Sequence, residues 1–173
     1  MKLLAPLSTK ERQLLFKQTS KTPGLIENLL RGLSPGQLTA PQVHGFSLHE
    51  QVWHLADLER EGFQFRLQVL LSQKFPCLEN FDGDEVAKQR HYHSLSLQQA
   101  FMIFSETRLK NLWLLSGINH ADWMRRGMQN GVGEVCVADV FRAMAAHDLS
   151  HIQEIEAILR GDAPLKSDST VAA

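Results

Sequence analysis

The chain has 173 residues, of which 43% are hydrophobic and 21% charged, enough for one globular domain with a core of its own. Its formal net charge of -1 provides no broad attraction for nucleic acid or anionic lipid, so neither is expected as a partner. Two cysteines are too few for a disulfide framework, and no apolar run approaches the roughly 20 residues that cross a bilayer, so a cytoplasmic protein is predicted.

The first half of the chain is expected to form two helices. The first covers residues 8–33 and is kinked or restarted by Pro23. After a loop, Ser47 and Glu50 have the spacing of a capping box, in which each side chain satisfies the backbone of the other. The second helix then continues, with Gly62 as its only interruption, until the next proline.

The second half begins with a polar connection that has room for a short helix, and two long helices follow. Ser96 and Gln99 repeat the capping pattern and open the third helix, and the fourth begins near Val137. The alternation that is typical of strands never persists. The expected fold is all-α, an antiparallel four-helix bundle with one domain at residues 1–161 and a flexible tail at 162–173.

Three polar residues of the fourth helix lie on its apolar face or at the edge of that face. At 100° per residue, His147, Asp148 and His151 fall near the arc that also holds Met144 and Ile155. A buried polar group without a partner costs roughly 1–3 kcal/mol, so each of the three needs one. A metal ion is one such partner, since two imidazoles at spacing i, i+4 converge as ligands require. Histidines that hydrogen bond to a core carbonyl are the alternative.

The second helix offers further polar residues, which lie together along one side. His54 shares a stripe with Glu50, Asp57 and Glu61, whereas Trp53 belongs to the apolar side. This stripe is either a solvated face or one wall of a polar cleft between the second and fourth helices.

Two segments together resemble a known family. The stretches "FSLHEQVWHLADLE" and "VADVFRAMAAHDLSHIQEI" are similar to the DinB-like (YfiT-like) superfamily of metal-binding four-helix bundles, whose members show a helix-two histidine in an H-L-x-D-x-E context and an H-x-x-x-H on the last helix. The resemblance implies that His54, His147 and His151 bind a divalent ion such as zinc or nickel, with further positions open. One departure is Cys136, where a serine or threonine is expected to cap the fourth helix.

The resemblance also implies an activity on a small molecule, either a metal-dependent transfer that uses a low-molecular-weight thiol or a hydrolysis. Three neutral imidazoles leave the charge of the ion uncompensated, which lowers the pKa of a bound water or thiol. Glu50 and Asp57, one turn on either side of His54, are candidates for orienting it or for transferring a proton, unless they face solvent. Arg125 and Arg126 are candidates for binding a substrate carboxylate, with ordinary loop charges as the alternative.

A different class of function is a non-enzymatic metal-binding or stress-associated bundle whose ion is structural. An open coordination position favours the enzyme, whereas a fourth ligand from Glu50, Asp57 or Asp148 favours the structural role. In either case, protonation of the histidines near their ordinary pKa of about 6.5 is expected to release the metal.

Several other side chains carry expectations of packing or association. A second metal site at His91 and His93 and a nucleophilic role for Cys77 are not favoured. The tryptophans are expected to pack in the core or at the bundle ends, namely Trp53, Trp113 and Trp123. The second helix carries apolar residues on both sides, more than packing against one bundle interface requires, and this predicts a homodimer. These residues are Trp53, Leu58, Phe63, Phe65 and Val69.

Overall fold

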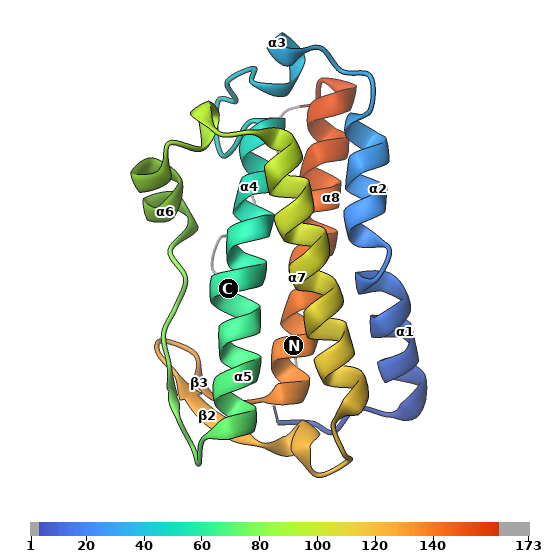
Figure 1. The fold of residues 1–173 in the computed structure, drawn as a ribbon, viewed down its shortest axis with the longest axis vertical. Coiled ribbons are helices and arrows are strands. Elements are labelled where there is room, and N and C mark those ends of the chain that lie inside the picture. The colour runs from blue at the N-terminus through green and yellow to red at the C-terminus, as the bar shows by residue number, and fades with distance from the viewer. Residues whose placement is uncertain (1–3, 163–173) are drawn as a thin grey trace.

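A computed structural model describes residues 4–162 and confirms the all-α four-helix bundle (Figure 1). The first bundle helix is broken into α1 and α2, and the second is one continuous rod of α4, a π-helical segment and α5. The third and fourth are α7 and α8. The bounds are α1 Thr9–Thr19, α2 Thr22–Leu30, α4 Leu48–Asp57, the π-helical segment Leu58–Gln64, α5 Phe65–Ser72, α7 Leu97–Gly117 and α8 Val137–Arg160. The predicted tail lies, from residue 163 onward, outside the described residues.

The four bundle helices do not simply alternate in direction along the chain. The rod of α4 and α5 runs in the same direction as α7, and α1 with α2 runs in the same direction as α8 (Figure 1). Hydrogen bonds fix the second pairing, because Arg142 of α8 contacts Glu11 of α1, and Asp148 contacts Thr22 of α2. Two successive parallel helices require a long return connection, which residues 73–96 provide.

The helix ends follow the capping patterns of the sequence. The Ser47 hydroxyl accepts from the backbone N–H of Glu50, whose carboxylate accepts from the N–H of Ser47, so the predicted capping box is confirmed. The break between α1 and α2 falls just before Pro23, as predicted. At the start of α8, the carboxylate of Asp139 accepts from both the backbone N–H and the thiol of Cys136. These two hydrogen bonds cap the helix without a serine or threonine.

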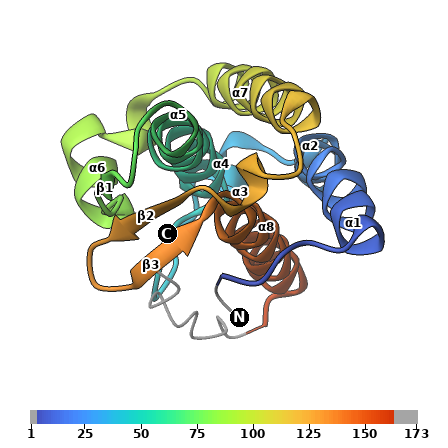
Figure 2. The ribbon, with the colours of Figure 1, turned by 90° about the horizontal axis from the view of Figure 1, so that it is seen from below.

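A small sheet at one end of the bundle was not predicted. Its strands are too short for alternation to show, and β1 pairs in parallel with β2, which pairs antiparallel with β3. The hairpin between β2 and β3 turns at Gly131, whose positive φ of 72° suits glycine. Figure 2 shows the sheet beside α5 and α8. The strands are β1 Cys77–Leu78, β2 Arg126–Gln129 and β3 Gly133–Cys136, and the short helices are α3 Pro35–Leu38, α6 Gly83–Arg90 and the 3-10 turns Tyr92–Ser94 and Asp122–Met124.

The core consists of two apolar clusters with polar residues at intermediate positions along the helices. One cluster, toward the sheet, contains Phe141 and Met144, and the other contains Val52 and Ile155. Along α8, the polar residues predicted to face inward lie between Met144 and Ile155. These inward-facing polar residues therefore lie where the apolar packing of the bundle is interrupted.

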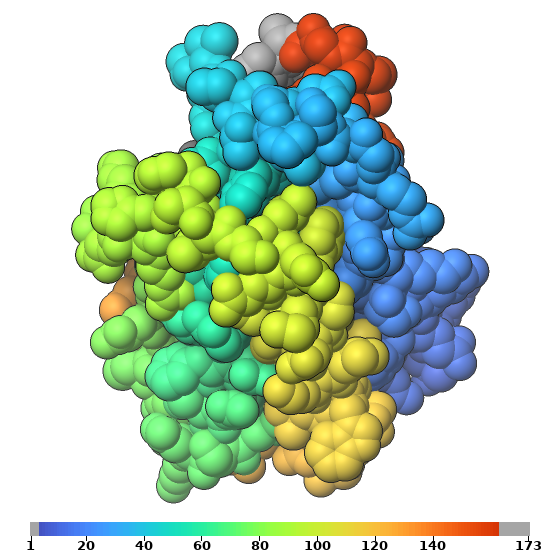
Figure 3. All heavy atoms as spheres, turned by 45° about the horizontal axis from the view of Figure 1, so that its top comes forward, coloured from blue at the N-terminus to red at the C-terminus, as the bar shows by residue number. Residues whose placement is uncertain are grey.

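Two expectations about apolar side chains are corrected. Trp113 is 79% exposed on α7, although Trp53 and Trp123 are buried as predicted. On the second bundle helix, Leu58 is fully buried and only Phe65, at 47%, is well exposed, so the surface expected for a partner is largely core. Figure 3 shows the outer face of α7, in yellow-green to yellow, between the green α5 and the blue α1 and α2.

No helix in the described part of the chain is long and apolar enough to cross a membrane.

Candidate metal centre

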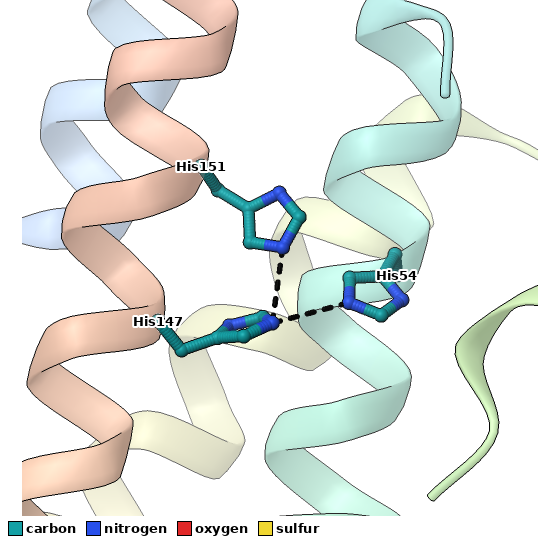
Figure 4. A group of neighbouring side chains, drawn as sticks. All are labelled: His54, His147 and His151. Carbon is teal, nitrogen blue, oxygen red and sulfur yellow. Dashed lines mark hydrogen bonds between the residues drawn. The ribbon is translucent and has the colours of Figure 1, made fainter. Parts of the chain in front are cut away.

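Three histidines from two helices meet in the bundle interior (Figure 4). His54 extends from α4, and His147 and His151 extend from successive turns of α8. The Nε2 atom of His147 lies 3.2 Å from Nε2 of His54 and 3.0 Å from Nε2 of His151. One ring nitrogen from each histidine lies within 4.8 Å of the other two. The structure thus brings together the three residues that the sequence singled out.

The spacing of these nitrogens fits a metal ion. Zinc–nitrogen bonds are about 2.0–2.1 Å long, so two nitrogens of a tetrahedral site lie about 3.3 Å apart. The two contacts with Nε2 of His147, at 3.2 and 3.0 Å, are close to that separation. Neutral imidazoles that face one another share too few protons for every nitrogen to be hydrogen bonded. A divalent ion satisfies all three nitrogens at once.

Burial keeps the three imidazoles neutral. It lowers the pKa of His54 to about 3, with a contribution from His151, and it lowers the pKa of His151 to about 4. The pKa of His147 falls well below its ordinary value, first because of burial and then because of the two other histidines, Arg108 and Arg66. All three therefore carry a lone pair at neutral pH. Burial thus moves protonation of His54 and His151 below the ordinary pKa of about 6.5, and the loss of metal at acidic pH stays a prediction.

The surroundings of the three rings differ. The Nδ1 atom of His151 is hydrogen bonded to Oε1 of Gln51, whereas Nδ1 of His54 and of His147 are buried with no hydrogen-bond partner in the described chain. Gly83 lies against His54 so closely that an added Cβ atom would be 2.4 Å from Cε1 of the ring. Phenylalanine rings complete the apolar environment, with centroids 5.1–6.0 Å from a histidine ring. They are Phe46 at 5.1 Å and Phe81 at 6.0 Å from His54, and Phe63 at 6.0 Å from His147.

The two carboxylates proposed beside His54 are engaged elsewhere. Glu50 accepts from Ser47 in the capping box. Asp57, fully buried, accepts from the Tyr92 hydroxyl at 2.8 Å and pairs with Arg90 at 2.6 Å. No hydrogen bond joins either carboxylate to a histidine among residues 4–162, so their contacts favour structural support over proton transfer.

Next to the histidines lies a buried ionic network that sequence reasoning found only in part. Arg108 of α7 donates to Asp148 at 2.5 and 2.8 Å and to Glu59 at 2.7 Å. Asn111 donates to Glu59 at 2.7 Å, and Thr22 donates to Asp148 at 2.6 Å. Only Asp148 was predicted to face inward. The missed signal was the spacing of Arg108 and Asn111 along the apolar face of α7, in line with the buried side chains Phe104 and Leu115.

The two arginines proposed for substrate binding contact other parts of the protein. Arg125 donates to the carbonyl oxygens of Leu70 at 2.8 Å and Gln73 at 3.0 Å, which ties it to the end of α5. Arg126 pairs with Glu134 across the hairpin at 3.1 Å. A role in substrate binding stays a prediction for both residues.

The described residues offer no fourth protein ligand at the histidine cluster. Within residues 4–162, the group of side chains able to hold an ion contains the three histidines alone. The three carboxylates named as possible fourth ligands bind elsewhere: Glu50 to Ser47, Asp57 to Tyr92 and Arg90, and Asp148 to Arg108 and Thr22. A three-nitrogen set of this kind leaves coordination positions for water or substrate.

Comparisons with known proteins identify the family and the fold. A family model described as the DinB superfamily matches residues 18–155. A protein of Geobacillus thermodenitrificans (strain NG80-2), named "Putative metal-dependent hydrolase", is 25% identical over 135 residues, which cover 77% of this chain and 75% of the relative. The solved structure of YfiT from Bacillus subtilis, described as "a probable metal-dependent hydrolase with an unusual four-helix bundle topology", matches with a TM-score of 0.78 and 15% identity over 94% of each chain, which shows a shared fold. Because the family match extends from α1 into α8 and includes all three histidines, this chain belongs to the DinB superfamily.

Proposed function

We propose that this protein binds one divalent transition metal through His54, His147 and His151 and uses it to hydrolyse a small molecule. The observation that carries the proposal is the convergence of three neutral imidazole nitrogens without a fourth protein ligand in the described chain. The names of the Geobacillus relative and of YfiT, both described as metal-dependent hydrolases, support the same reaction class. Zinc and nickel suit a site of imidazole nitrogens.

The chain's own residues would prepare the site in three ways. A bound divalent ion supplies Lewis acidity, which activates water or a polarised substrate group. The three histidines are neutral, so they leave the charge of the ion uncompensated. The rings of Phe46, Phe63 and Phe81 reduce the local polarity, which strengthens electrostatic interactions at the centre. Glu50 supports the start of the helix that carries His54.

Two alternatives are separated from hydrolysis by experiment. Transfer of a low-molecular-weight thiol uses the same metal chemistry with a different nucleophile, and a structural ion without activity uses the same ligands. Metal content of untagged protein is measured first, followed by assays of ester, amide and phosphoester hydrolysis and of thiol consumption with electrophiles. Hydrolysis that depends on added metal supports the proposal. Metal-dependent consumption of thiol without hydrolysis replaces it by the transferase, and bound metal without either activity favours the structural role.

The ligand assignment has its own test. Replacement of each histidine by alanine in turn is expected to reduce metal content sharply while circular dichroism still reports a folded bundle, because the apolar core carries most of the stability. Wild-type protein that binds neither zinc nor nickel at micromolar concentration would overturn the proposal.

A homodimer in the cytoplasm stays a further proposal. Exposed apolar side chains remain at Phe65 on α5 and at Met102, Leu109 and Trp113 on α7, which are candidates for a partner surface. Sedimentation at tens of micromolar protein tests it, since an interface of standard size holds at that concentration. A monomer under those conditions contradicts the dimer.

A further inference from the structure

Within residues 4–162, one histidine of the cluster is held by a chain of hydrogen bonds that the other two lack. Nδ1 of His151 is hydrogen bonded to Oε1 of Gln51, and Nε2 of Gln51 donates to Oε2 of Glu154 at 2.9 Å. The same Glu154 oxygen lies 3.5 Å from Nδ1 of His151, and the Ser150 hydroxyl donates to the other carboxylate oxygen at 3.4 Å. Gln51 comes from α4 and is 2% exposed, so this chain links the two helices that carry the histidines.

The direction of each hydrogen bond in this chain follows from chemistry. A carboxylate only accepts, so the amide group of Gln51 must face Glu154 with its NH2, and its oxygen must face His151. That oxygen also only accepts. His151 therefore carries its proton on Nδ1 and presents a bare lone pair on Nε2 toward His54 and His147.

We propose that Gln51 and Glu154 are positioning residues, which fix His151 in the Nδ1–H tautomer before any metal is bound. The inference rests on the proposed metal site, and it assigns His151 as the preset ligand of the three. A partner of this kind orients the ring and raises its basicity, and its loss typically weakens metal binding by 10–100-fold.

The same logic gives His147 the opposite behaviour. Its Nε2 lies 3.0 Å from the bare Nε2 of His151, so without an ion between them this contact is a hydrogen bond only if Nε2 of His147 carries the proton. Binding of an ion requires that proton to leave Nε2, and one proton is taken up at Nδ1, so the ring stays neutral and no net proton is released. Metal binding thus changes the tautomer of His147 and leaves that of His151 unchanged.

The first experiment tests the tautomers without using activity. Long-range 1H–15N correlation spectra of metal-free 15N-labelled protein at neutral pH distinguish Nδ1–H from Nε2–H rings. The expected result is Nδ1–H at His151 and Nε2–H at His147, with only His147 changing on addition of zinc. An Nε2–H ring at His151 in the metal-free protein overturns the proposal. Because this measurement is made before metal is added, it tests the positioning residues even if the protein proves to bind no metal.

The second experiment measures the affinity for zinc in competition with a chelator. Gln51→Met keeps the shape of the side chain without its hydrogen bonds, and a loss of about 10–100-fold is expected, together with a mixed tautomer at His151. The double variant Gln51→Glu with Glu154→Gln reverses the polarity of one bond and still offers His151 an acceptor, so affinity and the Nδ1–H tautomer are expected to return. Gln129→Met removes another buried, hydrogen-bonded glutamine away from the histidines and serves as the matched control.

The outcomes of the second experiment are distinct. Gln51→Met with wild-type affinity and an unchanged His151 tautomer overturns the positioning role. Equal losses in Gln51→Met, the double variant and the Gln129→Met control also overturn it, because they indicate a general loss of packing. Wild-type protein without zinc affinity contradicts the proposed function alone, since the tautomer spectra then decide the inference.

Discussion

Two consecutive residues of α8 lead to polar clusters of opposite character. Asp148 joins Arg108 and Glu59, where each charge faces an opposite charge within 2.8 Å. His147 joins His54 and His151, where the Nε2 atoms of uncharged rings face one another. A cluster in which buried carboxylates already face a buried cation holds its members together within the chain, whereas one whose lone pairs converge on a point is suited to bind an ion.

The electrostatics of the two clusters differ in the same sense. Burial opposes the charge of Arg108, but the carboxylates of Glu59 and Asp148 outweigh this effect and raise the pKa of its guanidinium. At the histidines, burial is the largest effect and lowers the pKa values. The network therefore stays charged and the ligand set stays neutral, although the two clusters are joined through adjacent residues of one helix.

The largest effect is expected from breaking the matched cluster. Arg108→Met leaves Glu59 and Asp148 buried without their cation, which costs about 3–5 kcal/mol of unfolding free energy. Urea denaturation measures this loss, and Lys110→Met, at an exposed position of the same helix, is the control. A loss below about 1 kcal/mol would show that the network does not stabilise the fold as its geometry indicates.

Acid is expected to act on the histidine cluster. The pKa values of His54 and His151, about 3 and about 4 in the folded metal-free protein, lie below the 6.5 of an unfolded chain. The contribution of these neutral rings to stability is therefore complete above pH 6.5 and falls as the pH drops from there toward 4, by on the order of 3 kcal/mol for each histidine, because only the unfolded chain takes up protons in that range. Urea denaturation at a series of pH values measures this. In His151→Ala the pH dependence is expected to be smaller, and an identical profile would contradict the assignment.

Removal of one ligand is expected to separate metal binding from folding. His151→Ala deletes a neutral nitrogen from the three-ligand set, so the affinity for zinc is expected to fall by more than the roughly 100-fold typical of losing an outer partner. Competition with a chelator measures the affinity, and a thermal melt of the metal-free variant checks the fold. His120→Ala, at an exposed position outside the cluster, is the control. Equal affinity in the two variants would exclude His151 as a ligand.

The smallest effect is expected at the contact between α6 and His54. In Gly83→Ala the new Cβ would lie 2.4 Å from the imidazole, so the ring must shift, and about tenfold weaker zinc binding is expected. Stability should change by about 1 kcal/mol or less, since alanine restricts the unfolded chain and thereby offsets part of the cost of the close contact. Gly24→Ala, where no heavy atom lies within 4 Å of the added carbon, is the matched control. Unchanged affinity would show that the ring position tolerates movement.

The sequence was sufficient for the parts of the structure that depend on local chemistry. Ser47 with Glu50 located the start of α4, and Pro23 located the break in the first bundle helix, since caps and prolines act on their own turn. The helical period placed His147, Asp148 and His151 on the inward side of α8. The strands of the sheet were missed because segments of two to four residues carry no period.

The partners of the inward side chains depended on tertiary structure. The stripe of Glu50, His54 and Asp57 on the second helix was compatible with either a solvated face or a cleft, and periodicity within one helix cannot state what lies opposite. Packing of the segment that contains Tyr92 and Arg90 against α4 buried Asp57 and engaged its carboxylate with these two side chains. Trp113 shows the reverse case, since a tryptophan is usually buried and the packing of α7 leaves this one exposed.

By itself, the sequence determined the four long helices, the inward direction of His147 and His151, and, through its resemblance to the DinB-like superfamily, the choice of His54 as their partner. Only the tertiary structure decided that the three Nε2 atoms meet within a few ångströms, that Arg108 neutralises Asp148, and that Gln51 with Glu154 holds one ring. The physical reason is how far apart along the chain the interacting residues lie. Helix direction and capping are set by neighbours within a turn or two, whereas metal geometry and charge pairing depend on residues that are distant in the chain and meet only when the bundle closes.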